Sequence, residues 1–176
     1  MDKGANNDSG GNKAENSYAK KTEEVVKEGG ILARLYFDIH AKDAASLKDL
    51  AVGFSATLDK EEGVIFAISE IEEPLEDEKS FSTYITATVL FDSFISFIKF
   101  VVKVNPLSVE IIKPEEVTLK SVDVAESALY ISSVIHDMKI KMYKGTLTPQ
   151  EKLYVEETVK KRAELGKKLR GDGDAA

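Results

Sequence analysis

Apolar and polar residues alternate along several stretches of the chain, most clearly in ILARLYFDIHA at residues 31–41. Successive side chains of a strand point to opposite faces, so this alternation predicts a strand with one buried face. With prolines and β-branched residues as further signals, the pattern predicts four strands, at residues 31–41, 64–74, 81–91 and 107–112. Pro106 and Pro114 bracket the last strand, which favours an edge position because proline removes a ladder donor.

Apolar residues recur at spacings of three and four in the segments between these strands, which is typical of helices. Asp43 is the expected cap of a helix that ends near Gly63, and Asp92 is the expected cap of a helix over residues 93–104. The order strand, helix, strand, strand, helix, strand is the split βαβ pattern of the ferredoxin-like fold. We therefore expect an α+β, ferredoxin-like domain over residues 30–120, with an antiparallel four-stranded sheet whose first and third strands are central.

A hairpin of two helices is expected to follow over residues 121–170. The first helix has an apolar stripe at alternating spacings of four and three, formed by Val124, Ala128, Ile131, Ile135, Met138 and Met142. Gly145 is expected to stop this helix. Thr148, Pro149 and Glu151 predict the start of the next one, with Thr as cap, Pro at the first helical position and Glu three residues after the cap.

The composition excludes several classes of protein. The chain has no cysteine, which rules out disulfides, thiolate nucleophiles, iron–sulfur clusters and cysteine-ligated zinc. Residues 1–22 and 171–176 are polar and are expected to be disordered tails, because they offer too little apolar surface to offset the entropy of ordering. The first twenty residues lack the apolar segment of a secretory signal, and the longest apolar run, residues 94–104, is too short to span a membrane. We expect a cytoplasmic protein without membrane contact.

Charge is distributed unevenly. The net charge is −7, and residues 31–120 carry nine basic and sixteen acidic side chains, whereas residues 148–176 carry seven basic and six acidic ones. The candidate contacts for a polyanion are the basic residues near the C-terminus, namely Lys160, Lys161, Arg162, Lys167, Lys168 and Arg170. Two interpretations stay open: a solvated helix end whose cations complement the helix dipole, or a contact with RNA, ribosome or DNA.

Candidate catalytic and metal-binding residues are few. His40 and Asp38 share a face of the first strand at i and i+2, but neither this pair nor His136 with Asp137 is expected to form a dyad. The acidic run at residues 70–78 lacks the ligand spacing of a calcium loop and is interpreted as a solvated turn that protects strand edges. The sequence contains no phosphate-binding glycine loop and no nucleophile elbow. We expect no catalytic residue, no cofactor and no metal.

Tyr36 and Tyr84 are expected on the outward faces of the first and third strands, with Arg34 beside them. RNA-recognition domains stack bases on aromatic residues of the same two strands. However, residues 81–91 lack the glycine- and aromatic-rich motif of those domains, and the acidic body repels phosphate. The C-terminal helices either pack on this face, which makes both tyrosines part of an interface, or project and use the apolar stripe as a coiled-coil-like dimer seam.

The segment FISFIKFVVKVNPLSVEIIKPEEV, residues 94–117, resembles the closing helix–strand unit of small ferredoxin-like domains. It is similar to the C-terminal unit of WYL-type transcriptional regulators and to a group of archaeal ferredoxin-like proteins that continue into C-terminal helices. The WYL core and the helix-turn-helix of those regulators are not visible in the sequence. The resemblance therefore implies the fold and an intracellular protein, and no regulatory role.

These patterns lead to three hypotheses. The first is a non-enzymatic interaction module that binds a protein partner, or itself as a homodimer, through the apolar stripe and the two tyrosines. The second is an accessory nucleic-acid- or ribosome-binding protein that uses the basic C-terminal helix. The third is a small-molecule sensor or enzyme with a pocket between the sheet and the helices.

Overall fold

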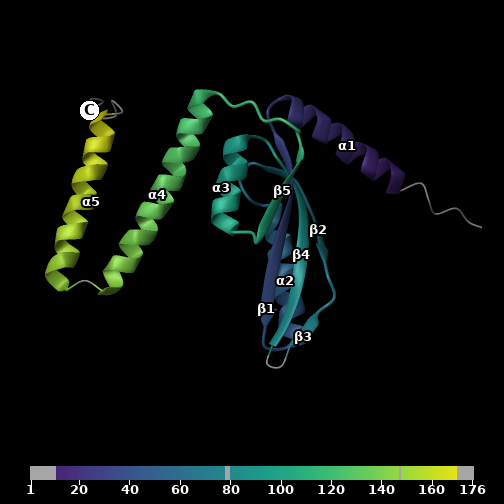
Figure 1. The fold of residues 1–176 in the computed structure, drawn as a ribbon, viewed down its shortest axis with the longest axis horizontal. Helices are drawn as coiled ribbons and strands as arrows, with labels where there is room; N and C mark the ends of the chain where they lie inside the picture. The colour runs from purple at the N-terminus through teal and green to yellow at the C-terminus, as the bar shows by residue number, and fades with distance from the viewer. Residues whose placement is uncertain (1–10, 78–79, 147, 170–176) are drawn as a thin grey trace, which may run out of the picture. The chain divides into compact units, whose positions relative to one another are not determined.

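The computed structural model describes residues 11–77, 80–146 and 148–169. In these residues five helices and five strands follow one another along the chain (Figure 1). They are α1 (Gly11–Lys27), β1 (Ile31–Ala41), α2 (Ala44–Leu58), β2 (Val64–Ile71), β3 (Leu75–Asp77), β4 (Ser80–Phe91), α3 (Phe94–Val104), β5 (Ser108–Lys113), α4 (Ser121–Thr146) and α5 (Pro149–Leu169). The chain divides into two compact units, residues 1–128 and 129–176, with the boundary inside α4.

The sheet belongs to the first unit and is antiparallel, with the strand order β2-β4-β1-β5. The predicted first and third strands, β1 and β4, are central, and they pair from Ile31 opposite Phe91 to Ala41 opposite Phe81. β5 ends the order, as its flanking prolines predict. The prediction of four strands is wrong, because the short β3 pairs with the start of β4 in a segment expected to be a turn.

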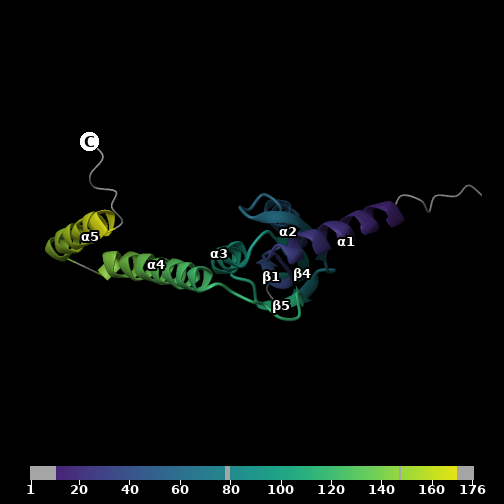
Figure 2. The same ribbon diagram turned by 90° about the horizontal axis from the view of Figure 1, so that it is seen from above.

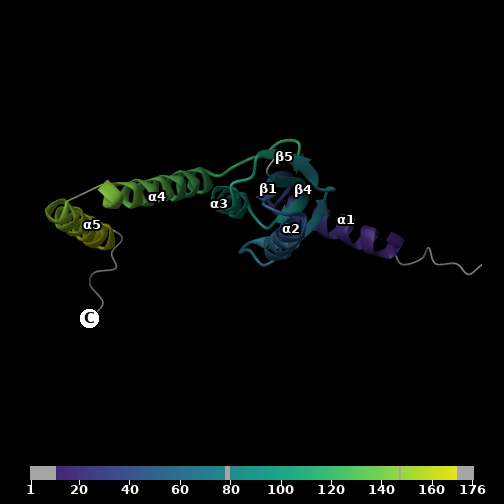
Figure 3. The same ribbon diagram turned by 90° about the horizontal axis from the view of Figure 1, so that it is seen from below.

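The core lies on one face of this sheet, between the central strands and the helices α2 and α3. Figure 2 and Figure 3 show α2 on one side of β1 and β4. Phe91 of β4 contacts Phe97 and Phe100 of α3 edge to face, with ring centroids 5.5 and 5.1 Å apart. The buried cluster comprises Ile31, Ala33, Leu35, Phe37, Ala51, Leu58, Ile85, Ala87, Val89, Phe91, Phe97 and Phe100. The strand residues among them share one face, as the alternating pattern predicts.

Two helix starts confirm the capping predictions. The Asp43 carboxylate accepts the backbone N–H of Ser46 at 2.8 Å and caps α2. Before α5, the Glu151 carboxylate accepts the Thr148 N–H at 2.8 Å, and the Glu151 N–H donates to the Thr148 hydroxyl at 3.4 Å. This is the reciprocal capping box that the sequence predicts. The predicted stop at Gly145 is wrong by a small margin, since α4 continues to Thr146.

Helix α1 departs most from the expectation drawn from the sequence, which is a disordered tail through residue 22. Gly11–Lys27 is helical, whereas residues 1–10 and 170–176, where the other tail is expected, lie outside the described residues. The Tyr18 ring packs edge to face on Phe66 of β2, with centroids 5.0 Å apart. Thr22 is buried and donates to the Tyr18 carbonyl at 2.8 Å. Tertiary contact with the sheet therefore orders a segment whose own composition favours disorder.

The end of α1 is fixed by two glycines. The Gly29 N–H donates to the Val26 carbonyl and the Gly30 N–H to the Val25 carbonyl, which is the hydrogen-bond pattern of a Schellman motif. Gly29 adopts φ +101°, a conformation that residues with a Cβ rarely adopt. A Cβ at Gly30 would overlap Val25 and the carbonyl of Phe91. The turn after α1 therefore lies close to Phe91, the last residue of β4.

Candidate functional site

Helix α4 carries many exposed apolar side chains. The predicted stripe is exposed at all six positions, and its larger side chains range from 38% exposed at Ile131 to 73% at Met142. Its spacing of four and three places the six residues at the a and d positions of a heptad repeat. Leu129, outside the stripe, is 71% exposed as well. α4 thus presents to solvent a pattern that other helices use to pack against a partner helix.

Helix α5 is exposed at every position whose side chain is described, residues 149–154 and 156–165. Lys160, Lys161 and Arg162 are among them. The side chains of Lys167 and Lys168 lie outside the described residues, and so does the whole of Arg170. The helix therefore offers basic side chains to solvent together with several exposed apolar ones, Leu153, Tyr154, Val159 and Leu165.

Tyr36 and Tyr84 lie on the sheet face opposite the core. Tyr36 is paired with Thr86, two residues from Tyr84, so the two tyrosines are diagonal neighbours on adjacent strands. The Tyr36 hydroxyl donates to Glu110 of β5 at 3.4 Å, and the Arg34 guanidinium pairs with the same carboxylate at 3.3 Å. The hydrogen bond with Tyr36 and the charge of Glu110 raise the pKa of Arg34 above its ordinary value. Arg34 is therefore already paired with a carboxylate, which weakens the case for phosphate binding on this face.

Asp38 and His40 are in contact, although no dyad is expected from the sequence. The His40 Nε2 and the Asp38 Oδ2 lie 2.8 Å apart, and the imidazole is 62% exposed. The other carboxylate oxygen of Asp38, Oδ1, is buried, and in the described part of the chain it has no hydrogen-bond partner. His136 lies half-buried on α4. The signal for the pair was its shared face at i and i+2, which brings side chains together along a strand.

A cavity of about 460 Å³ opens where α1 ends and α3 begins. Its walls are the end of α1 with the glycine turn, the first residues of α3, and the segment that leads into α4. Both signs of charge line it, from Lys27, Glu28, Glu116, Lys120 and Asp123. This mixture favours neither an anionic nor a cationic ligand.

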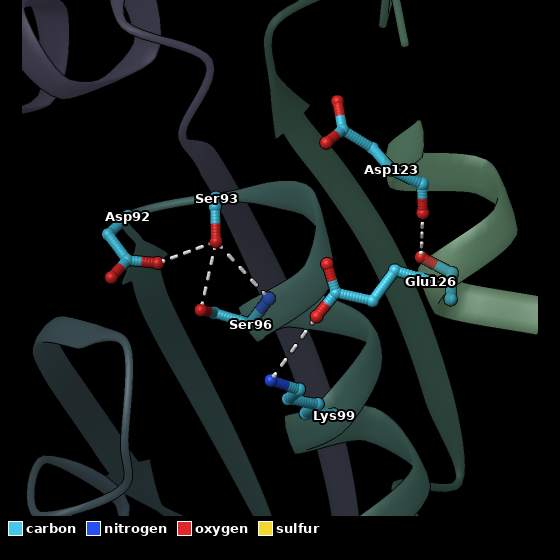
Figure 4. Close-up of polar contacts among 7 residues, drawn as sticks. Asp92, Ser93, Ser96, Lys99, Asp123 and Glu126 are labelled. Carbon is cyan, nitrogen blue, oxygen red and sulfur yellow. Dashed lines mark hydrogen bonds and ion pairs between the residues drawn. The ribbon is translucent and has the colours of Figure 1, made fainter. Parts of the chain in front are cut away.

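The polar contacts beside this cavity show that the predicted N-terminal cap of α3 is wrong. Figure 4 shows Ser93 between Asp92 and Ser96, and Lys99 of α3 directed toward Glu126 of α4. Ser93, and not Asp92, is the cap of α3; it accepts the Ser96 N–H and donates to Asp92 at 2.8 Å. Both residue types are good caps, so their adjacency in the sequence does not show which one is used. The Lys99–Glu126 ion pair, 3.9 Å long, joins α3 to the first turns of α4.

The residues that the structure describes contain no group of three or more histidine, aspartate or glutamate side chains arranged to hold a metal ion. In the described part of the chain, none of the helices has the length and apolar character needed to cross a membrane.

Comparison with known proteins gives one match. A model of the MJ0538 family matches residues 32–165, which run from β1 into α5 and include the whole apolar stripe together with Lys160, Lys161 and Arg162. Searches of curated proteins and of solved structures found no match. Because the matched range covers about three quarters of the sequence, the chain belongs to the MJ0538 family.

Proposed function

We propose that this protein is a non-enzymatic interaction module that self-associates as a homodimer through α4. The observation that supports this function is the exposure of the heptad-spaced stripe from Val124 to Met142. Soluble monomers rarely expose large contiguous apolar patches, and such patches usually mark interaction sites. The α4 helices of two copies can bury this stripe by inserting the a and d side chains of each into the other.

Two polar side chains of the open sheet face, Arg34 and Tyr36, pair with Glu110, which leaves them less available to bind a substrate. The strand order, with α2 and α3 on one face, supports a ferredoxin-like arrangement to which β3 is an addition.

The experiment is sedimentation equilibrium of the full chain over a wide range of concentrations. We expect a dimer that dissociates on dilution. The variant Ile131→Glu/Ile135→Glu places two charges in the seam and is expected to be monomeric at every concentration, because a charge without a partner is costly to bury. Circular dichroism should show that the variant retains its secondary structure.

A matched control adds the same charges outside the stripe. Leu50 and Ile68 are exposed to a similar extent, 53% and 42%, so Leu50→Glu/Ile68→Glu should leave the dimer intact. A wild-type chain that is monomeric throughout would refute the proposal. Equal weakening in both double variants would also refute it, since the effect would then follow total charge and not the seam.

A second candidate function is polyanion binding by α5. The exposure of Lys160, Lys161 and Arg162 supports it, because cations must be accessible to contact phosphate. The test compares the binding of single-stranded and structured RNA at low salt by the intact chain and by Lys160→Glu/Lys161→Glu. Binding that this variant loses, and that falls steeply with added salt, would support nucleic acid as the ligand.

A further inference from the structure

An apolar groove of about 480 Å³ lies between α2 and the end of β2 in the first unit. Its floor contains Leu47, Ala51 and Thr83, all of which are buried. The Thr83 hydroxyl donates to the Glu72 carbonyl at 2.6 Å. Because this hydroxyl already has an acceptor, the floor presents mainly apolar surface to anything that enters the groove.

The walls of the groove are apolar and exposed. Val52 of α2 is 52% exposed and Ile71 of β2 is 42% exposed. Ile71 is paired with Ile85, whose side chain is fully buried on the core face of the sheet. Ile71 therefore points to the same face as the core but lies at the edge strand, where α2 leaves it partly uncovered.

The rim of the groove is acidic. Glu72 and Glu73 line it, and Glu76, which is exposed, follows them along the chain. Among the lining residues that the structure describes, Lys48 of α2 is the one basic side chain. Acidic side chains therefore outnumber basic ones at the rim, and they lie directly beside the exposed walls. A ligand with complementary character has an apolar face and a basic edge.

We propose that this groove docks a basic amphipathic helix of a partner protein. Such a helix carries apolar residues at spacings of three and four, which can cover Val52 and Ile71, and basic residues on either side, which can pair with Glu72 and Glu73. Nucleic acid lacks the apolar face, and an acidic peptide would be repelled by the rim. This surface is separate from the stripe on α4, so the proposal goes beyond self-association.

The test uses a fluorescent synthetic helix of about 18 residues, roughly five turns, with leucine on one face and lysine on the other. A second peptide has glutamate in place of lysine. Anisotropy is measured with the full chain at low salt. We expect the lysine peptide to bind and the glutamate peptide not to bind. In NMR spectra of the full chain, the lysine peptide should shift the amide signals of Leu47, Ala51 and Ile71.

Three variants locate the binding. Glu72→Lys/Glu73→Lys and Val52→Lys should each weaken binding of the lysine peptide about tenfold, since charge reversal at a rim and loss of an apolar contact each have effects of this order. The control Glu23→Lys/Glu24→Lys makes the same charge change on exposed residues of α1 and should alter binding less than about twofold. The glutamates are exposed, so their variants test the proposal even if Val52→Lys does not fold.

Several results would overturn the proposal. Equal weakening in the Glu72/Glu73 and Glu23/Glu24 variants would show that the peptide responds only to net charge. Equal binding of the two peptides would exclude the acidic rim as the recognition element. Self-association that is lost in Val52→Lys but retained in Glu23→Lys/Glu24→Lys would show that a second copy of this chain occupies the groove.

Discussion

Replacement of Tyr18 by alanine should destabilise the first unit, because the Tyr18 ring packs on Phe66 at 5.0 Å and helps hold α1 on the sheet. Tyr18 is 44% exposed, so about half of its side chain is buried. Half of the burial energy of a large side chain is about 1 kcal/mol, and an edge-to-face aromatic pair adds about 0.5–1.5 kcal/mol. We therefore expect a loss of about 2 kcal/mol, of which about 1 kcal/mol is coupling between the two rings.

The coupling is measured with a double-mutant cycle of Tyr18→Ala and Phe66→Ala. The chain has no tryptophan, and the helices of the second unit contribute to any circular dichroism signal. Amide hydrogen exchange of β1 and β4 avoids both problems, because it reports the opening free energy of the sheet itself. The exchange rates of the central strands should rise by the factor that corresponds to the lost free energy.

Tyr84 provides the control for this cycle. It is 45% exposed, nearly the same as Tyr18, and lies on the same face of the sheet as Phe66. The cycle of Tyr84→Ala with Phe66→Ala should give a coupling energy near zero. A coupling energy of zero for Tyr18 and Phe66 as well would refute the docking of α1, and the expectation of a disordered N-terminal tail would then hold for this segment.

Three further predictions follow from local geometry. Gly30→Ala should destabilise the sheet by about 1–3 kcal/mol in hydrogen exchange, because the added Cβ overlaps its neighbours, whereas Gly53→Ala, in open space on α2, should stabilise it slightly. Hydrogen bonds from Ser46 lower the pKa of Asp43 in the folded protein. The cap therefore stabilises α2 fully at pH values above the ordinary pKa of 3.8, and this stabilisation is lost as the pH falls through the lowered pKa of the folded state. Asp43→Asn should reduce the loss of stability on acid titration. Thr148→Ala should return the lowered pKa of Glu151 toward its ordinary value in an NMR titration.

The sheet could be predicted from the sequence because its central strands bury one face and expose the other. That requirement fixes the alternation along 31–41 and 81–91, and both strands are observed with the expected neighbours. The same reasoning fails for β3, which has three residues, since two or three positions cannot establish a period. Strands could therefore be predicted where one face is buried along many residues, as in β1 and β4.

Helix α1 could not be predicted from composition, because its stability comes from residues far away in the sequence. Leu90 points away from the core, yet it is 0% exposed. Its cross-strand partner Phe66 contacts the Tyr18 ring of α1. α1 thus covers the sheet face opposite the core at the position of Phe66 and Leu90. A usable signal was present in the glycine pair at 29 and 30, since glycine after a helix is the usual C-terminal cap. The pair of valines before it strengthens that signal.

The residues of the stripe on α4 could be predicted from their spacing, but the surface that contacts them could not. Periodicity shows which face of a helix is apolar and does not show what packs against that face. The spacing itself discriminates between the two surfaces considered for it. A helix packed on a sheet usually has a broad apolar face with a period of 3.6, whereas the a and d stripe is a narrow seam with a period of 3.5. In a straight helix, equivalent positions of such a stripe drift by about 20° per heptad, or about 40° over the two heptads from Val124 to Met138. The drift is removed only when two helices supercoil around each other, so the pattern favours a second helix over a sheet face as the surface that buries it.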